Sequence, residues 1–201
     1  MDLIFSQALG PIKFALAEKA AQAEKYILYG GVNPPCRKGC SSCCYQLIHV
    51  LIAEAIIIYE YLKTQKQWQA VRERARAQFE FLKDNPHPIV WFKMGKQCPV
   101  LDPETKTCMA YSTRPIACAI HFVLSNPKTC DPYYTGGEEY QALDFNNLFN
   151  EFRDIVDKNV AGFGILGMEL PLPVALLLSE RISIQSGVSL EKAVSLILNE
   201  L

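Results

Sequence analysis

Eight cysteines, four of them within nine residues, constrain this chain more than any other feature of its sequence. The dense segment, residues 34–44, also contains prolines, a glycine and serines, and it offers few apolar side chains to bury. Thiolates this close together repel one another unless a positive centre lies between them, and a thiophilic metal ion or an iron–sulfur cluster is such a centre. The cysteines are Cys36, Cys40, Cys43 and Cys44 in the dense segment and Cys98, Cys108, Cys118 and Cys130 beyond it.

Disulfide bonding is the alternative use of an even number of cysteines, and it is typical of small secreted domains with little core. This chain has 201 residues, half of them hydrophobic, so it can build a core without covalent cross-links. Its first residues lack the basic, apolar and small-residue pattern of a secretory signal. We therefore expect metal or cluster binding in a cytoplasmic protein.

Charge and hydropathy narrow the expected partners. Twenty basic and twenty-one acidic residues give a net charge of -1, with no basic stripe of the kind that tracks nucleic-acid phosphates. The longest apolar stretch, residues 47–61, is interrupted by His49, Glu54 and Glu60, which excludes a membrane-spanning helix there. We expect no nucleic-acid partner and no membrane partner.

Apolar periodicity predicts a chain that is mostly helical. Pro11 is expected to open the first helix and Gly30 and Gly31 to end it, while Ser189 is a suitable cap for the last. The second helical segment is apolar on all sides, which is typical of a buried helix. Helices are expected over residues 11–28, 45–65, 68–83, 140–160, 173–185 and 190–201.

Residues 98–108 predict a short hairpin, with its turn at Asp102 and Pro103. The expected fold class is therefore mostly α, a helical domain wrapped around an irregular cysteine-rich metal-binding knot with a short hairpin. We expect one domain over residues 1–201. Its cysteine-cluster core is residues 36–120, and helical extensions at residues 1–35 and 138–201 pack on that core.

The spacing of the cysteines suggests how they meet. Cys36, Cys40 and Cys43 lie on a tight loop and can point at one centre. Cys43 and Cys44 are adjacent, so their side chains diverge, and one of them is expected to reach a second centre or to remain a buried or reactive thiol. The distant cysteines reach the first loop when their segment folds over it, which ties folding to metal loading.

The combined motifs resemble the YkgJ-type cysteine-cluster proteins, a family described as zinc- or iron-chelating. The resemblance covers roughly residues 36–120 and is carried by Cys-x3-Cys-x2-Cys-Cys, by Glu54-Ala55 in an apolar helix, by Cys98-Pro99-Val100-Leu101-Asp102, and by Cys108-x2-Tyr111-x2-Arg114-Pro115-x2-Cys118. It implies that the metal ligands are Cys36, Cys40, Cys43, Cys44, Cys98, Cys108 and Cys118. Flagellin lysine N-methylases look like larger, distant members, which implies a methylation-like enzyme as one alternative.

One departure from the family pattern concerns charge. A basic residue usually follows the cysteine of the Arg-Pro-x2-Cys motif, and here that residue is Ala119. If the family residue balances the charge of the thiolates, Arg37, Lys38 or His121 must do so in this chain. Arg114 is a further candidate, since it can donate hydrogen bonds to thiolates.

The identity of the metal is the next question. Zinc sites with four cysteines typically show two Cys-x2-Cys pairs, and only Cys40 and Cys43 form one here. A three-cysteine loop with a remote fourth cysteine is more typical of cluster ligation, so we favour a [4Fe–4S] cluster over Zn²⁺. Cys130 and His121, which follows Cys118 at Cys-x2-His spacing, remain open as further ligands.

Three functions stay open at this point. The favoured one is a metal-ion or iron–sulfur cluster binding protein with a redox or metal-handling role. The alternatives are a small Fe–S or zinc-dependent enzyme that modifies a partner protein, and a structural zinc module that binds a protein partner. The sequence shows no Ser–His–Asp set and no paired-carboxylate motif, and the Gly-x-Gly-x-x-Gly pattern at residues 162–167 lacks a preceding strand and is predicted to be a connection between helices.

Overall fold

The alanine-rich N-terminal segment forms one long helix, α1 (Leu3–Tyr29), in the computed structural model, which describes residues 3–160 and 164–184. The predicted end is confirmed: the Gly30 N–H donates to the Tyr26 carbonyl, and Gly31 has a φ of 66° that favours glycine. The predicted start at Pro11 is wrong, because this proline lies inside the helix. The burial of neighbouring apolar side chains such as Ile12 offsets the hydrogen bond that the proline removes.

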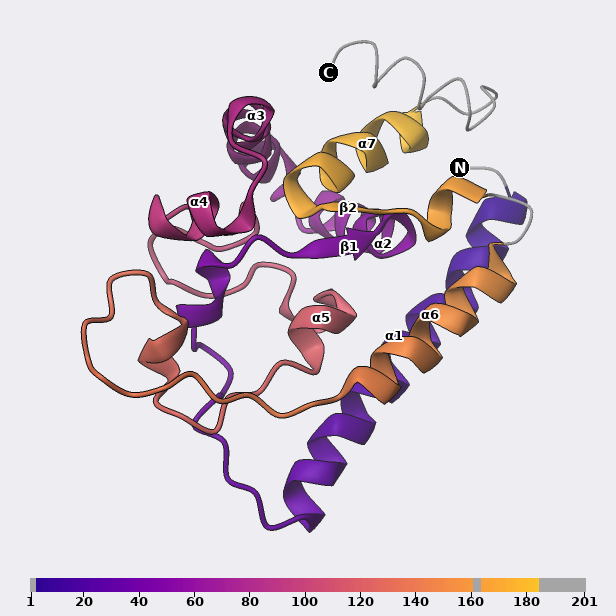
Figure 1. The fold of residues 1–201 in the computed structure, drawn as a ribbon. Helices are drawn as coiled ribbons and strands as arrows, with labels where there is room; N and C mark the ends of the chain where they lie inside the picture. Colours follow the sequence, from indigo (N-terminus) through magenta and orange to yellow (C-terminus); the bar gives the residue numbers. More distant parts are fainter. Residues whose placement is uncertain (1–2, 161–163, 185–201) are drawn as a thin grey trace.

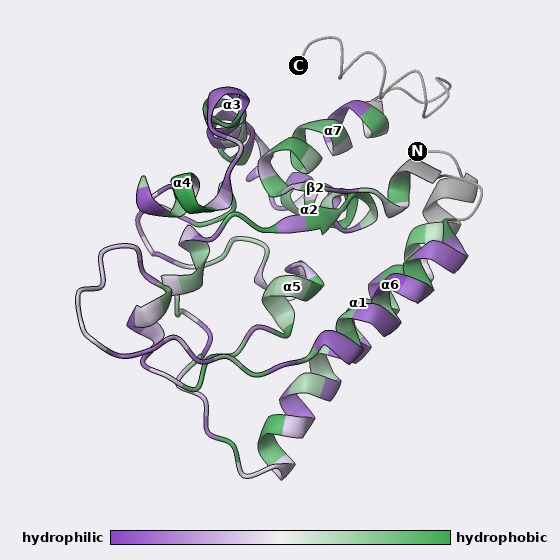
Figure 2. Cartoon of the chain, in the orientation of Figure 1, coloured by the Kyte–Doolittle hydropathy of each residue, from purple (hydrophilic) through white to green (hydrophobic). Residues whose placement is uncertain are grey.

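Helix α6 (Asn146–Asn159) lies along α1, as Figure 1 shows. Buried apolar residues of both helices belong to one core cluster, and Figure 2 shows polar and apolar residues alternating along the two helices. The helix begins later than the predicted residue 140, because residues 140–143 are extended and bonded to residues 122–124. Val123 and Ala142 form an isolated antiparallel bridge there.

The apolar segment 45–65, predicted to be one helix, is divided in the structure. A 3-10 helix, η1 (Ser42–Tyr45), and a strand, β1 (His49–Leu51), precede α2 (Ile52–Thr64). Strand β1 pairs antiparallel with β2 (Glu169–Pro171), with His49 opposite Pro171. This partner is far along the chain, so local periodicity could not reveal the strand. The predicted burial is confirmed, since nine of the thirteen residues of α2 are buried.

Helices α3 (Trp68–Asp84) and α7 (Leu172–Ile184) pack against one another, and α7 packs on α2. Both helices match their predicted ranges to within a residue. No helix was predicted between residues 83 and 140, but the structure has the short helix α4 (Pro88–Lys93) there, whose first turn is capped by the His87 Nδ1 accepting from the Ile89 N–H. The helix predicted at residues 190–201 lies outside the described residues.

The cysteine-rich segment between α4 and α6 has short elements only, which confirms the expected helical fold around an irregular core. The predicted hairpin is present as a single bridge between Leu101 and Cys108, and Asp102 holds its turn. The other elements are η2 (Tyr111–Thr113), α5 (Ile116–Ala119) and η3 (Pro127–Cys130), with η4 (Gly164–Gly167) leading to β2 further on. Among the described helices, none is both long and apolar enough to cross a membrane.

Candidate metal centre

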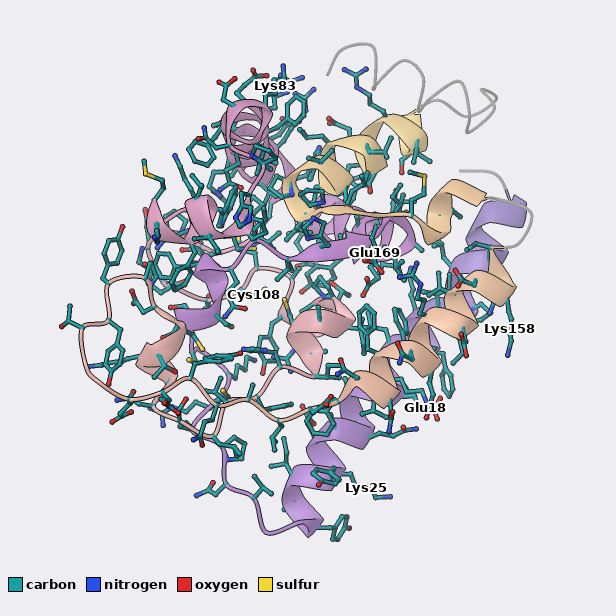
Figure 3. All side chains as sticks on the ribbon, viewed as in Figure 1. Glu18, Lys25, Lys83, Cys108, Lys158 and Glu169 are labelled. Carbon is teal, nitrogen blue, oxygen red and sulfur yellow. The ribbon has the colours of Figure 1, made fainter. Side chains whose placement is uncertain are left out.

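Six of the eight cysteines line one cavity of about 80 Å³. One wall is formed by the cysteines of the dense loop and of the segment that folds over it, and Figure 3 shows Cys108 in the space between η1 and α5. Much of the remaining lining forms an apolar wall, which includes Ile58 of α2, Trp91 of α4 and Leu172 of α7. The cysteines that line the cavity are Cys40, Cys43, Cys44, Cys98, Cys108 and Cys118.

Two sets of hydrogen bonds bring the distant cysteines to the first loop. The Cys98 N–H donates to the Cys44 carbonyl oxygen at 2.6 Å, which fastens the hairpin to η1. The buried Glu54 carboxylate accepts from the Ile116 N–H at 2.7 Å and from the Leu51 N–H at 3.0 Å. Because α5 carries Cys118, this carboxyl group joins the Cys118 segment to the start of α2. The expected folding of this segment over the first loop is therefore observed.

Cys36 and Cys130 do not line the cavity. The Val123 N–H donates to Cys36 Sγ at 3.3 Å, and Cys130, only 3% exposed, ends η3, which packs against η1. His121 also lies outside the cavity lining: its ring stacks on Tyr140, and its Nε2 lies 3.2 Å from the Tyr140 hydroxyl. Burial lowers the pKa of His121.

The cavity thiols differ in acidity. A hydrogen bond with Cys44 lowers the pKa of the Cys43 thiol to about 7, and the same bond and burial raise that of Cys44. Burial, followed by the neighbouring thiolate of Cys108, raises the pKa of Cys98 to about 12. Burial likewise raises the pKa of Cys118 well above its ordinary value. Cys44, Cys98 and Cys118 thus keep their protons at neutral pH until a positive centre displaces them, whereas the Cys43 thiol is already partly ionised there.

Arg114 supplies positive charge to this wall. Its guanidinium carbon lies 4.3 Å from the centre of the Tyr111 ring, and the Lys38 ammonium lies 5.6 Å from the same ring centre. Burial raises the pKa of Cys108, and the Arg114 charge opposes this rise. Arg114 is therefore a cation that acts on the cavity thiols, and Lys38 shares its aromatic neighbour.

The size and the polar groups of the cavity show whether its residues fit a bound metal ion or cluster. Among the described residues, no group of three or more His, Cys, Asp or Glu side chains is already arranged to hold a metal ion. The cavity is several times larger than the 10–15 Å³ or so that one water requires, so it has room for more than a single ion. Trp91 in its lining is 1% exposed and its Nε1–H has no partner, which costs about 1–3 kcal/mol unless an acceptor is present. Sulfur atoms of a bound group are such acceptors, so the residues fit a thiolate-bound group.

Trp91 lines the cavity, and the sequence analysis did not predict it there. It lies in a short helix after a proline-rich break, and nothing in its local pattern connects it with the cysteines. Tyr111, which the motif includes, has a contact with two cations that the sequence did not predict.

Comparisons with known proteins bear on the same segment. The sequence model of the CxxCxxCC family, described as "Putative zinc- or iron-chelating domain", matches residues 35–139, which is 105 of the 201 residues. The matched range contains all eight cysteines, and it confirms the family resemblance seen in the motifs. A search of curated proteins and a search of solved structures each found no match.

Proposed function

The chain belongs to the CxxCxxCC family of zinc- or iron-chelating domains, and on that premise we propose that its cysteine-lined cavity holds a [4Fe–4S] cluster with a redox or metal-handling role. One observation carries the proposal: six cysteines, from the dense loop and from the distant segment, line a single cavity. Cys98, Cys108 and Cys118 supply three ligands from the distant segment, and the dense loop supplies the fourth.

The size of the cavity supports a cluster over a single zinc ion. A structural zinc site is closed, with four sulfurs about 2.3 Å from the ion. The described cysteines are not gathered so closely, and the cavity that they line has a volume of about 80 Å³. A group of several atoms uses this space better than one ion does.

The surrounding residues support a redox role for such a group. A bound iron–sulfur cluster supplies one-electron transfer, at a potential set by charge, hydrogen bonds and exposure to solvent. Arg114 and Lys38 contribute positive charge, the Trp91 indole offers a hydrogen-bond donor, and the apolar wall excludes water. The positive charge and the hydrogen-bond donor make such a cluster easier to reduce, whereas exclusion of water opposes the extra negative charge of the reduced state.

The test is to purify the protein without oxygen and to measure its visible spectrum, iron and acid-labile sulfide. We expect a brown protein with about four iron and four sulfide per chain in the cavity centre, lost in the Cys118→Ser variant. His121→Ala is the matched control, because His121 is near Cys118 in the chain but does not line the cavity, and it should retain the colour. A colourless protein that holds only zinc would overturn the cluster and favour a structural zinc module.

A further inference from the structure

Helix α4 carries an exposed apolar face on the side away from the metal cavity. Trp91, its buried residue, lines the cavity, whereas Ile89, Val90 and Met94 are 57%, 37% and 59% exposed. Successive residues lie about 100° apart around an α-helix, so Ile89 and Lys93 share one row along its surface and Val90 and Met94 share the next. Trp91 lies on the other side of the helix from these two rows.

The exposed apolar area continues beyond the end of α4. Gly95 follows the helix with a φ of 61°, and a methyl group added there would collide with the Tyr133 hydroxyl. The Tyr133 side chain, which is 68% exposed, therefore lies beside the end of α4. Single exposed apolar residues are common, but a contiguous group of them marks an interaction site. We call the group the α4 face, and its residues are Ile89, Val90, Met94 and Tyr133, with Lys93 and Lys96.

Positive charge accompanies the α4 face. Between Asp84 and Asp102 the chain contains Lys93 and Lys96 and no carboxylate side chain. Neither lysine belongs to an ion pair among the described residues. Asp131, the carboxylate beside the tyrosine of the face, accepts a hydrogen bond from a backbone N–H. A partner surface that complements the α4 face is therefore apolar at its centre and acidic around it.

The α4 face is close to the metal cavity. Figure 1 shows α4 at an outer edge of the molecule, and the Trp91 ring packs edge-on against Phe81 of α3, with 6.3 Å between the ring centres. This contact holds α4 in place over the cavity that Trp91 lines. An α-helix with its side chains is about 10 Å thick. A protein docked on the α4 face would therefore lie about one helix thickness from a group bound in the cavity.

The shape of the α4 face favours a protein partner over a small molecule. Small-molecule sites are concave, whereas the outer side of a helix is convex. Weak electron-transfer complexes use the smallest protein interfaces, and opposite charges around the contact steer the two proteins together. A few exposed apolar side chains with two unpaired lysines, next to a candidate redox centre, match this class of interface.

We propose that the α4 face is the docking surface for a small one-electron carrier protein with an acidic surface. This inference rests on the proposed redox role of the cavity centre. In the docked complex the reduced carrier gives one electron to the group in the cavity, so the carrier is oxidised by one electron and the group is reduced by one. No covalent bond forms or breaks in this exchange.

The experiment uses flavodoxin, an acidic flavin protein, as the carrier and measures its binding to the anaerobically purified chain by titration calorimetry. We expect binding at low salt that weakens as salt screens the charges. Lys93→Glu/Lys96→Glu should weaken it by about tenfold or more, because two attractive charges become repulsive. Lys13→Glu/Lys25→Glu is the matched control: it changes the net charge equally on exposed positions of α1, where Figure 3 labels Lys25, and should bind as the parent does.

A second variant, Ile89→Ser/Met94→Ser, tests the apolar part of the α4 face. We expect weaker binding with an unchanged dependence on salt, because the lysines remain. Both side chains are exposed, so the fold should be retained, which circular dichroism checks. In stopped-flow mixing with reduced flavodoxin, both α4 variants should slow the bleaching of the iron–sulfur absorption, and the α1 control should not.

The remaining outcomes separate the two proposals. Absence of flavodoxin binding, or equal loss of binding in the α4 and α1 lysine variants, overturns the inference, and a chain that still contains iron and sulfide then keeps the proposed function. If the chain instead binds mixed phosphatidylcholine and phosphatidylglycerol vesicles through Lys93 and Lys96 and does not bind flavodoxin, the α4 face belongs to a membrane surface and the inference is likewise overturned. A chain without iron that binds flavodoxin through the α4 face contradicts the proposed function and supports the docking surface.

Discussion

Glu54 is a buried carboxyl group at the junction of α2 and α5, with 2% of its surface exposed. Burial raises its pKa from 4.5 to about 7, although the N–H groups of Ile116 and Leu51 act in the opposite direction. Between these two pH values the folded protein binds a proton that the unfolded chain does not. The stabilisation from this group is therefore fully present below about pH 4.5 and is lost as the pH rises through about 7.

The Glu54→Gln variant tests this pH dependence. Glutamine has one acceptor oxygen for the two N–H groups, so we expect the variant to be less stable than the parent protein at pH 5. From pH 4.5 to 7.5 the unfolding free energy of the parent protein should fall by about 3 kcal/mol relative to that of the variant, because Glu54 ionises in this range and glutamine does not. Urea unfolding of both proteins at several pH values measures these free energies. A difference that widens with pH would show that the carboxyl group is stabilised in its charged form instead.

At the level of elements, α3 and α7 are joined by the carboxylate of Glu180. It accepts from the Trp68 Nε1–H at 2.7 Å and from the Arg72 Nε–H at 2.6 Å, and it is largely buried. Both bonds cross between helices whose apolar faces already pack together. The carboxylate thus fixes the position of α3, while apolar burial supplies most of the stabilisation.

Removal of this carboxylate should destabilise the pair of helices. We expect Glu180→Ala to lower the unfolding free energy by about 1–3 kcal/mol, because the buried Trp68 N–H loses its acceptor. The control is Glu80→Ala on helix α3, because the exposed pair of Glu80 with Lys83 is worth at most about 0.5 kcal/mol. Chemical denaturation measures both variants. Equal effects in the two would rule out the special role of Glu180.

Across the whole molecule, metal binding and folding should be coupled. The segment that carries Cys98, Cys108, Cys118 and Cys130 has only short elements, and helices of three or four residues are not stable alone. A bound group that joins this segment to the dense loop stabilises the folded state by its binding free energy.

Chelation should therefore lower the melting temperature. If the free concentration of the bound group is 1,000 times its dissociation constant, removing the group should lower the melting temperature by on the order of 10 °C for a chain of this length. Calorimetry of the loaded and chelator-treated protein measures it, and the Cys98→Ser/Cys118→Ser double variant should show a much smaller change. Identical melting temperatures in the loaded and treated protein would show that the fold does not depend on the centre.

Prediction from the sequence worked where the signal is local. Helix α3 matches its predicted range because its apolar residues follow the helical period, and α7 matches because its apolar run begins at a proline that suits the first turn of a helix. Strand β1 was missed because its partner β2 is far away in the chain, and the start of α1 was misplaced because packing of α1 tolerates Pro11 within the helix. Helix α4 was missed because prolines before a short segment are equally typical of a loop.

The sequence by itself determined the chemistry of this protein: the number of thiols, their motif, the family and the absence of a basic residue at position 119. Only the tertiary structure decided which thiols meet. Cys36 and Cys40 are neighbours in the motif, yet Cys40 lines the cavity and Cys36 does not. The reason is that long-range hydrogen bonds place each thiol, such as those from Val123 to Cys36 and from Cys98 to the Cys44 carbonyl, and no local pattern encodes such bonds.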